Sequence, residues 1–319
     1  MYNLGHLGLY KNIPKKRKFN RTPDYERDSY TLLQYKSHLR NEFLIPLKAN
    51  GDGSGVATIR LQSLETQSVK ITGNGKFYTG SAGTTAEGIE STIGTSRGRL
   101  YVKVPADESC YLVLSKADKL RGLGSESTNV IADGANVPYI NYCAINYPLI
   151  NLSVIRFNGG VLNSSFIGSI DNTPSLAYLG IYQNTLSKFT GTIDDKTNLN
   201  YISINGNYNS EITGDIGKTT KSNFFDFAAN TKSKLTYVTP RNTIDKWPSG
   251  ELRMIRLSMT SMTSEMCDNL LIDIDASGVI PVLNKVINLS GLCGAVTSAS
   301  AAARASLVNK GFTVVVNET

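Results

Sequence analysis

Residues 176–184 read LAYLGIYQN, a pattern of the form LxxLxIxxN. It returns 23 residues later as LNYISINGN at 199–207 and, shortened, as FDFAAN at 225–230. Apolar residues two positions apart point to one side of a strand, so the residue between them points outward. A buried asparagine bonds backbone groups of its own turn and of the next copy. The pattern therefore predicts a stacked asparagine ladder, formed by Asn184, Asn207 and Asn230.

A second motif keeps the same period. It consists of an apolar residue, a glycine two positions later and another apolar residue, and it reads FIGSI at 166–170, FTGTI at 189–193 and ITGDI at 212–216. The glycine permits a bend of the backbone, and the flanking apolar residues are expected to face inward. Two motifs locked to one period of 23 residues indicate a repeat protein whose copies stack on one another.

The first motif matches the leucine-rich repeat, and the second resembles the LxGxI segment of the leucine-rich repeats of plants. Less regular copies at 152–157, 252–257 and 287–289 extend the array on both sides. Residues 262–274 and 298–310 are predicted to be helices. The predicted fold class is a mixed α/β repeat: an N-terminal extended arm, a small antiparallel β-domain and a C-terminal leucine-rich-repeat solenoid.

Three domains are expected along the chain. Residues 1–42 form a basic anchoring arm with a short helix over 29–43, residues 43–118 an antiparallel β-domain, and residues 119–319 the leucine-rich-repeat-like solenoid with a C-terminal cap. Alternating apolar residues between glycine-rich turns predict the strands of the middle domain. The predicted strands of this domain and of the cap are 43–47, 56–61, 68–72, 100–104, 110–115 and 312–316.

The basic residues are concentrated in the arm. The chain has 33 Lys+Arg against 26 Asp+Glu, a net charge of +7, and residues 1–21 contain six basic residues and no acid. The remainder is nearly neutral, so nucleic acid is not an expected partner of the folded body. A solvated tail, an anchor that wraps a partner and a nuclear or nucleic-acid segment are the open interpretations of this cluster. As a virion anchor it would use Lys11, Lys15, Lys16, Arg17, Lys18 and Arg21.

No catalytic residue, cofactor or metal is predicted. The two histidines, His6 and His38, both lie in the arm, which excludes a Ser/His/Asp or Cys/His site within the folded body. Motifs for a zinc protease, a P-loop or a dinucleotide are missing. The carboxylate pairs at 194–195 and 273–275 are interpreted as solvated acids rather than as glycosidase acids. The four cysteines show no CxxC spacing and are interpreted as buried thiols.

The outward residues of the repeated strands are expected to form a ligand-binding face. Their row is polar and weakly charged, with one tyrosine and two arginines, residue types that are favoured as interface anchors. Such a face suits a glycan or another protein's backbone, and the alternative is a hydrated sheet face without a ligand. The candidate ligand-binding residues are Arg156, Asn158, Tyr182, Ser203, Asn205, Asp226, Arg256, Ser258 and Asn288.

The repeat half resembles the irregular leucine-rich-repeat proteins of gut Bacteroidales and of the phages that infect them. The closing residues 307–316, LVNKGFTVVV, are similar to the capping end of that group. No secretory signal and no apolar stretch long enough to span a bilayer are seen. We therefore expect a protein made in the host cytoplasm, without membrane insertion, and located in the virion.

The resemblance implies a non-enzymatic structural protein of a tailed phage: a tail fibre, a head fibre or a decoration protein. Its arm would bind other virion proteins, and its repeats would face outward toward a host-surface glycan or protein. A homo-oligomer is compatible with this role. Two alternatives remain open, a polysaccharide-degrading virion enzyme and a leucine-rich-repeat adaptor that binds a protein partner.

Overall fold

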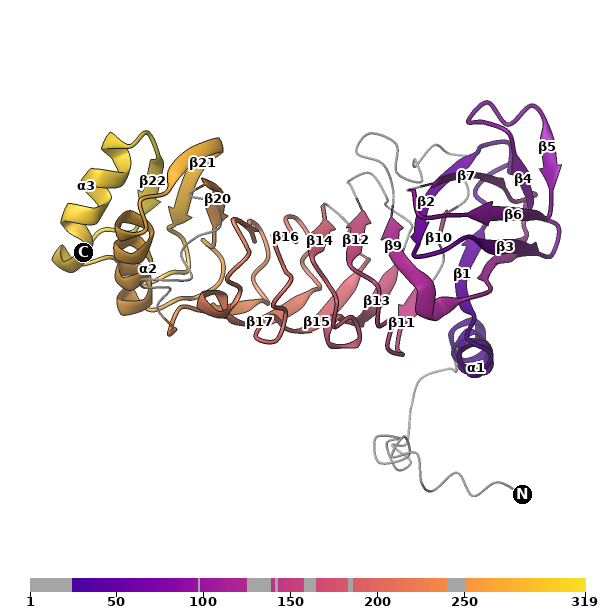
Figure 1. The fold of residues 1–319 in the computed structure, drawn as a ribbon, viewed down its shortest axis with the longest axis horizontal. Helices are drawn as coiled ribbons and strands as arrows, with labels where there is room; N and C mark the ends of the chain where they lie inside the picture. The colour runs from indigo at the N-terminus through magenta and orange to yellow at the C-terminus, as the bar shows by residue number, and fades with distance from the viewer. Residues whose placement is uncertain are drawn as a thin grey trace, which may run out of the picture.

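The protein is elongated in its computed structural model, with antiparallel strands at the N-terminal end, parallel strands in the middle and two helices at the C-terminal end (Figure 1). The structure describes residues 25–96, 98–124, 139–140, 143–157, 165–182, 186–239 and 251–319. The six basic residues of the predicted virion anchor lie outside these ranges, and so do Asn158 and Asn184.

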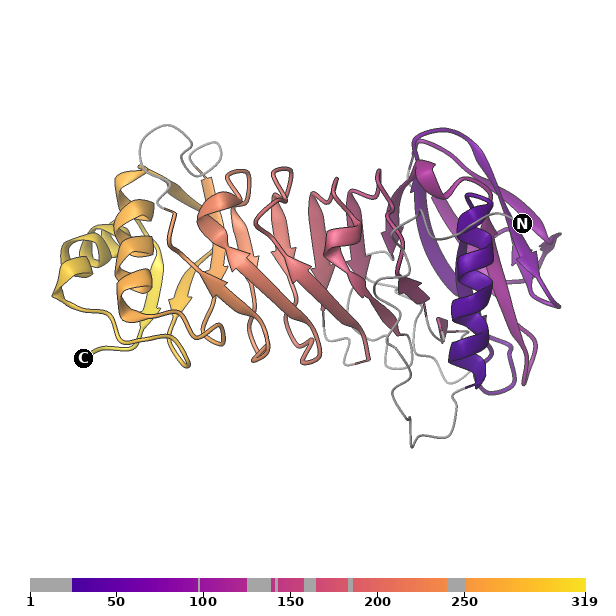
Figure 2. The same cartoon turned by 90° about the horizontal axis from the view of Figure 1, so that it is seen from below.

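An antiparallel sheet lies at the N-terminal end, in the strand order β10-β1-β8-β3-β6. Its strands are β1 (Phe43–Lys48), β3 (Gln67–Thr72), β6 (Glu90–Ile93), β8 (Ser109–Leu114) and β10 (Tyr139–Ile140). Its inner face belongs to the main core, whereas the helix α1 (Tyr25–Leu39) covers the outer face through Tyr30, which packs with Leu44. Figure 2 shows this helix lying along the sheet.

The predicted helix over 29–43 is confirmed as an element, but α1 begins and ends four residues earlier. The helix stops because Asn41 adopts a left-handed backbone conformation with φ of 60°. Asparagine tolerates this conformation better than most residues, and it ends helices there. Phe43 then starts β1.

A second sheet has twelve strands and runs the length of the molecule, in the order β22-β21-β20-β18-β16-β14-β12-β9-β2-β7-β4-β5. The N-terminal strands pair antiparallel; they are β2 (Ala57–Ser63), β4 (Lys76–Tyr78), β5 (Ala86–Gly88) and β7 (Gly98–Lys103). From β9 onward the strands pair parallel; they are β9 (Leu120–Gly124), β12 (Val154–Phe157), β14 (Tyr178–Ile181), β16 (Tyr201–Ser203), β18 (Phe224–Asp226), β20 (Glu251–Arg256), β21 (Ile280–Leu289) and β22 (Thr313–Val316).

A third sheet is wholly parallel and lies opposite the parallel part of the twelve-stranded sheet (Figure 1). Its strands are β11 (Cys143–Ile145), β13 (Phe166–Ser169), β15 (Lys188–Thr192), β17 (Glu211–Asp215) and β19 (Lys234–Thr236). The core fills the space between these two sheets; Leu179 and Ile202 from one and Phe189 from the other are fully buried in the same cluster. Apolar residues from both motifs of the sequence therefore meet in one interior.

Close packing between successive turns explains the glycine of the second motif. Gly214 has a φ of +123°, and a Cβ atom there would lie 2.8 Å from Asp194 Oδ1. A larger residue would be strained in its backbone and would also displace that carboxylate. The glycine thus lets β17 pair closely with β15.

The predicted fold class is wrong. Instead of a mixed α/β leucine-rich-repeat solenoid, the protein is mostly β-sheet, with 41% strand and 18% helix. The LxGxI-like segments pair laterally into a parallel sheet, and the twelve-stranded sheet continues through β2 and β9 into the antiparallel strands. The α-helices of the described ranges are α1 and, at the C-terminal end, α2 (Ser264–Ala276) and α3 (Ala301–Asn309).

Several individual elements are confirmed. The predicted strands 43–47, 56–61, 68–72, 100–104 and 110–115 correspond to β1, β2, β3, β7 and β8, with ends that differ by two residues at most. The predicted helices 262–274 and 298–310 correspond to α2 and α3, and the predicted strand 312–316 to β22. The four cysteines are buried free thiols, as interpreted from their spacing.

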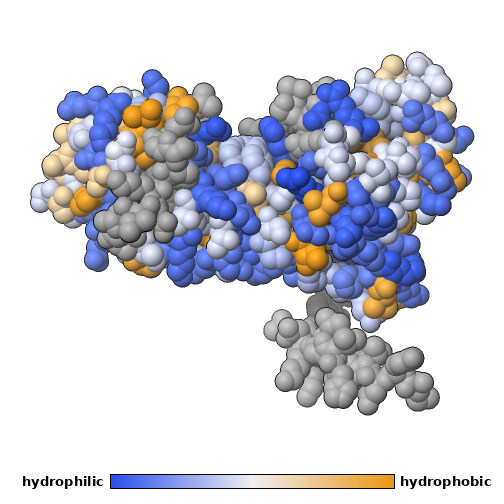
Figure 3. Space-filling model, viewed as in Figure 1, coloured by the Kyte–Doolittle hydropathy of each residue, from blue (hydrophilic) through white to orange (hydrophobic). Residues whose placement is uncertain are grey.

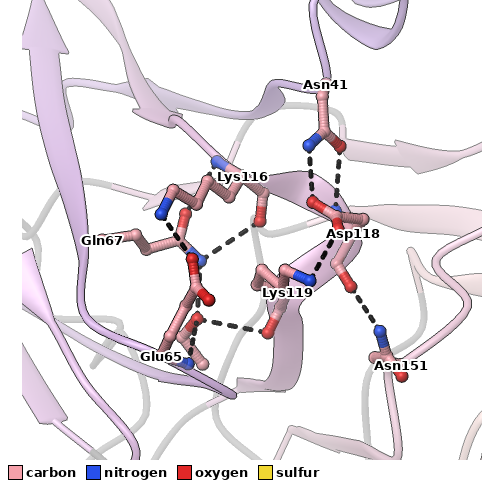
Figure 4. Close-up of polar contacts among 8 residues, drawn as sticks. Asn41, Glu65, Gln67, Lys116, Asp118, Lys119 and Asn151 are labelled. Carbon is pink, nitrogen blue, oxygen red and sulfur yellow. Dashed lines mark hydrogen bonds and ion pairs between the residues drawn. The ribbon is translucent and has the colours of Figure 1, made fainter.

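A polar network joins the N-terminal sheets to the first parallel strands (Figure 4). The Asn41 side chain donates a hydrogen bond to the Asp118 carboxylate and accepts one from the Asp118 backbone N–H at 3.0 Å. Asn151 donates to the Asp118 carbonyl at 2.6 Å. Gln67 bonds both the carbonyl and the N–H of Lys116. Three segments that are distant in sequence are thereby held around one turn.

Candidate functional site

A row of aromatic rings runs across the outer face of the twelve-stranded sheet, on the side away from the core. Tyr178, Tyr201 and Phe224 occupy neighbouring strands, 23 residues apart. Tyr178 stacks on Tyr201 with ring centroids 4.1 Å apart, and Tyr201 stacks on Phe224 at 4.1 Å. Because the rings cover one another's faces, this aromatic row presents ring edges and hydroxyl groups to a ligand.

Arg156 lies at one end of the aromatic row. Its guanidinium carbon is 5.6 Å from the centroid of the Tyr178 ring, which is a cation–π contact. The Tyr178 ring lies across Gly180, where a Cβ atom would come 2.8 Å from ring atom Cε1. Glycine at this position therefore makes room for the ring, and the ring in turn supports the arginine.

Tyr182 adds a second hydroxyl to this end of the row. Its hydroxyl group is hydrogen-bonded to that of Tyr201. Burial, together with the neighbouring Tyr178, raises the pKa of Tyr182 above its ordinary value. A tyrosine hydroxyl is already neutral at pH 7, and the raised pKa keeps Tyr182 neutral at higher pH, so it acts as both donor and acceptor.

Asp226 forms the centre of a separate polar group two strands further along. Its side chain is almost fully buried, and its carboxylate forms an ion pair with Arg256 at 2.6 Å. Asn205 donates to the same carboxylate at 3.3 Å, and the backbone N–H of Ala228 at 3.2 Å. Hydrogen bonds to a carboxylate are among the stronger ones, and the ion pair links β18 to β20.

The structure places the remaining predicted face residues as follows. Ser203 is fully buried beside Gly180, its partner in the sheet. Asn288 accepts hydrogen bonds from the N–H and hydroxyl of Ser290, so it shapes its own turn. Ser258 is half-buried, and its carbonyl accepts from Leu292. The described residues of the predicted row thus comprise a tyrosine–arginine group, an Asp226 group and three separate residues, Ser203, Ser258 and Asn288.

Two residues of the predicted asparagine ladder are buried and stacked. Asn230 donates from Nδ2 to the carbonyl of Asn207 at 2.5 Å and to that of Ser210 at 3.1 Å. The third residue of that ladder, Asn184, lies outside the described ranges. A second ladder, of buried serines, was not predicted from the sequence. The hydroxyl groups of Ser187, Ser210 and Ser233 each accept a hydrogen bond from a backbone N–H of the preceding turn.

Sequence reasoning also missed the aromatic row itself. Tyr178, Tyr201 and Phe224 each precede the first inward residue of the LxI core, and the predicted face began two positions later. Extending the alternation by one step toward the N-terminus would have found them, because they share the period of 23 residues.

The side of the molecule shown in Figure 3 is mainly hydrophilic, with small separate apolar patches. Among the described residues, no three His, Cys, Asp or Glu side chains are grouped so as to hold a metal ion. No helix in the described part is long and apolar enough to cross a membrane. Comparison with family models, curated proteins and solved structures finds no match to this chain.

Proposed function

We propose that this protein is a non-enzymatic recognition protein that binds a polar, uncharged ligand through the tyrosine–arginine end of its twelve-stranded sheet. The observation that carries the proposal is the joined arrangement of Arg156, Tyr178, Tyr182 and Tyr201. The stacked rings are held by the sheet, so they lose little conformational freedom when a ligand binds. Rigid tyrosines and arginines are the residues that contribute most to recognition surfaces.

The chemistry of this group favours hydroxyl-rich ligands. The tyrosine hydroxyls both donate and accept hydrogen bonds, and the guanidinium only donates. A glycan offers many hydroxyl groups of both kinds, as well as an apolar ring face that packs against ring edges. Asp226, the carboxylate of the neighbouring group, is already neutralised by Arg256 and adds little net charge. We infer that a neutral host-surface glycan is the ligand.

Binding of the full chain to host cells tests this proposal. We expect binding to survive protease treatment of the cells and to be lost after periodate oxidation of their glycans. Arg156→Ala should weaken binding about tenfold, and Tyr182→Phe should weaken it severalfold through one lost hydroxyl. Tyr208→Phe is the matched control, because Tyr208 is 51% exposed and lies outside the aromatic row. Protease-sensitive binding, or equal binding by all variants, would contradict the proposal.

We further propose that the protein is a structural component of a phage virion, where its N-terminal residues bind other virion proteins. The support is the sequence resemblance, together with the concentration of basic residues within residues 1–21. An extended segment gains affinity by wrapping a large surface when it becomes ordered on its partner.

Mass spectrometry of purified virions tests this second proposal. The chain should be present in a fixed ratio to the major capsid protein, and deletion of residues 1–24 should abolish its incorporation. The deletion stops before α1, because Tyr30 of that helix packs on Leu44 and its hydroxyl bonds the Leu44 carbonyl. Absence from virions, or normal incorporation of the truncated chain, would overturn the proposal.

A further inference from the structure

We propose that the outer face of β4 and β7, at the N-terminal end of the twelve-stranded sheet, binds an acidic glycan through Lys76 and Lys103. This face belongs to the part of the molecule to the right in Figure 1, distant from the aromatic row. The proposal adds a second site to the proposed recognition function and rests on different residues.

Two pairs of basic residues lie on this surface, and the two members of each pair are directly opposite each other. Lys76 on β4 is directly opposite Lys103 on β7, and Arg99 on β7 is directly opposite Arg60 on β2. All four are at outward positions, because they alternate with the buried residues of their strands. Like charges directly opposite each other destabilise an antiparallel pair. The Lys76–Lys103 pair is therefore expected to bind an anion.

Strands β2, β4 and β7 contribute no acid to this face, whereas the edge strand β5 beside β4 contains one, Glu87. The sequences of β2, β4 and β7 are ATIRLQS, KFY and GRLYVK, without aspartate or glutamate. Within the described ranges, no carboxylate lies within ion-pair distance of Lys76 or Lys103, whereas Lys70 on the other sheet pairs with Glu90 at 2.7 Å. The two lysines therefore contribute a local positive charge that a ligand can neutralise.

Lys103 is held in place by uncharged neighbours. Its ammonium nitrogen is 5.0 Å from the centroid of the Tyr78 ring, a cation–π contact. Gly83 lies close to the same side chain, where a Cβ atom would come 2.4 Å from Lys103 Cε. A lysine that is positioned by a ring and a glycine loses less side-chain entropy when it binds an anion.

A cavity of about 650 Å³ opens beside these lysines. This volume lies in the range of sites for small organic ligands. Tyr78, Ile89 and Pro105 supply an apolar wall, and Lys76 and Lys103 supply charge. The one lining carboxylate, Glu108, accepts a hydrogen bond from Asn74 at 2.9 Å. An apolar wall next to two ammonium groups suits a sugar ring that carries a carboxylate or a sulfate.

Titration of the full chain with polysaccharides of defined charge tests the site. We expect oligogalacturonate, which bears carboxylates, or dextran sulfate to bind, and neutral dextran not to bind. The preference between the first two identifies the anion. Binding should weaken as salt is raised, because the attraction between exposed charges is screened.

The double variant K76Q/K103Q should bind the acidic glycan at least about tenfold more weakly, and K76R/K103R should retain binding. The control K70Q/K188Q removes the same charge from lysines that are paired with Glu90 and Glu211, and it should bind normally. An unchanged thermal midpoint shows that each variant is folded. Tyr182→Phe should leave this binding unchanged, which separates the site from the aromatic row.

Four results would overturn the proposal. These are no binding of either acidic glycan, equal binding of neutral dextran, equal binding by K76Q/K103Q, and tighter binding of single-stranded DNA than of both glycans. The last result would indicate a nucleic-acid surface, since basic side chains beside tyrosines also suit unpaired bases.

Discussion

Lys196 occupies a buried position that is threonine in the turns before and after it. Thr173 and Thr219 are fully buried, and each hydroxyl bonds the carbonyl three residues earlier, at 2.7 and 2.8 Å. Lys196 has a side chain with no exposed surface, and it pairs with the exposed Asp195 at 2.9 Å. Replacing a buried ion pair with an apolar side chain of similar length often increases stability.

We predict that Lys196→Met raises the free energy of unfolding by about 1 kcal/mol, because it removes a buried charge and keeps the packing. Asp195→Asn should lower the free energy of unfolding, since it leaves the buried Lys196 ammonium group without its counter-ion. Urea denaturation of the two variants measures both effects. A lower midpoint for Lys196→Met would show that the ion pair is a net stabilising contact.

His38 gives the fold a pH dependence. Its ring stacks on Tyr147 with centroids 4.3 Å apart, and burial lowers its pKa from the ordinary 6.5. The unfolded chain therefore binds more protons in the interval just below pH 6.5, so stability decreases as the pH falls through that interval. The free energy of unfolding should decrease less between pH 7.5 and 5 in His38→Gln.

An NMR titration measures the pKa of His38 directly. The sequence has one other histidine, His6, so a His6→Gln variant assigns the two resonances. A His38 pKa above the ordinary value would mean that the nearby carboxyl end of α1 stabilises the imidazolium more than burial disfavours it.

At the scale of elements, Asp268 of α2 holds the start of the last helix. Its nearly buried carboxylate accepts hydrogen bonds from the N–H and hydroxyl of Thr297 and from the hydroxyl of Ser300. Burial opposes the charge, but these bonds outweigh it and lower the pKa of Asp268. We predict that Asp268→Ala destabilises the C-terminal end by about 1–3 kcal/mol, because it leaves buried donors without an acceptor.

Hydrogen exchange locates this effect. Amides of α3 and β22 should exchange faster in Asp268→Ala, and amides of β1 and β8 should not change. Since the folded pKa is lowered, the contribution of Asp268 is present above about pH 4 and is lost as the pH falls through the folded value. Uniform acceleration across all three sheets would show that the contact supports the whole fold.

The elements that the sequence predicted best are those with a local signal. Strand β8 shows clear alternation, and α2 begins after Thr263, whose hydroxyl accepts from the N–H of Met266 at 3.3 Å. The sequence FTGTI at 189–193 is different, because a bend and a strand explain its glycine equally well. Only the pairing of β15 with β13 and β17 decides between them, and that pairing is not local.

The sites were predictable to different degrees for the same reason. Tyr182 and Arg156 belong to different copies of the repeat. Each was predicted because inward and outward residues alternate along its own copy. Whether Lys76 and Lys103 face each other depends on the register of β4 against β7, and the two residues are 27 positions apart in the sequence. A one-residue slip would move one of the lysines to the opposite face, so no sequence pattern in either strand alone reveals the pair.

At the scale of the whole molecule, the twelve-stranded sheet crosses the sequence boundary expected at residues 118 and 119. Strand β9 pairs antiparallel with β2 and parallel with β12, so it belongs to both halves. The buried side chains Leu61, Leu123 and Ile155 lie in one core cluster across this junction. We therefore predict that the chain unfolds in one cooperative transition, visible as a single calorimetric peak.

Gly124→Val is the variant that tests this coupling. A Cβ atom at Gly124 would lie 1.9 Å from the Arg156 carbonyl oxygen, so a side chain there would separate β9 from β12. If the halves are coupled, both should melt together at a lower temperature, and residues 119–319 expressed alone should aggregate through the exposed edge of β9. Two separate peaks, or a soluble and folded 119–319 fragment, would show that the parallel strands form an independent domain.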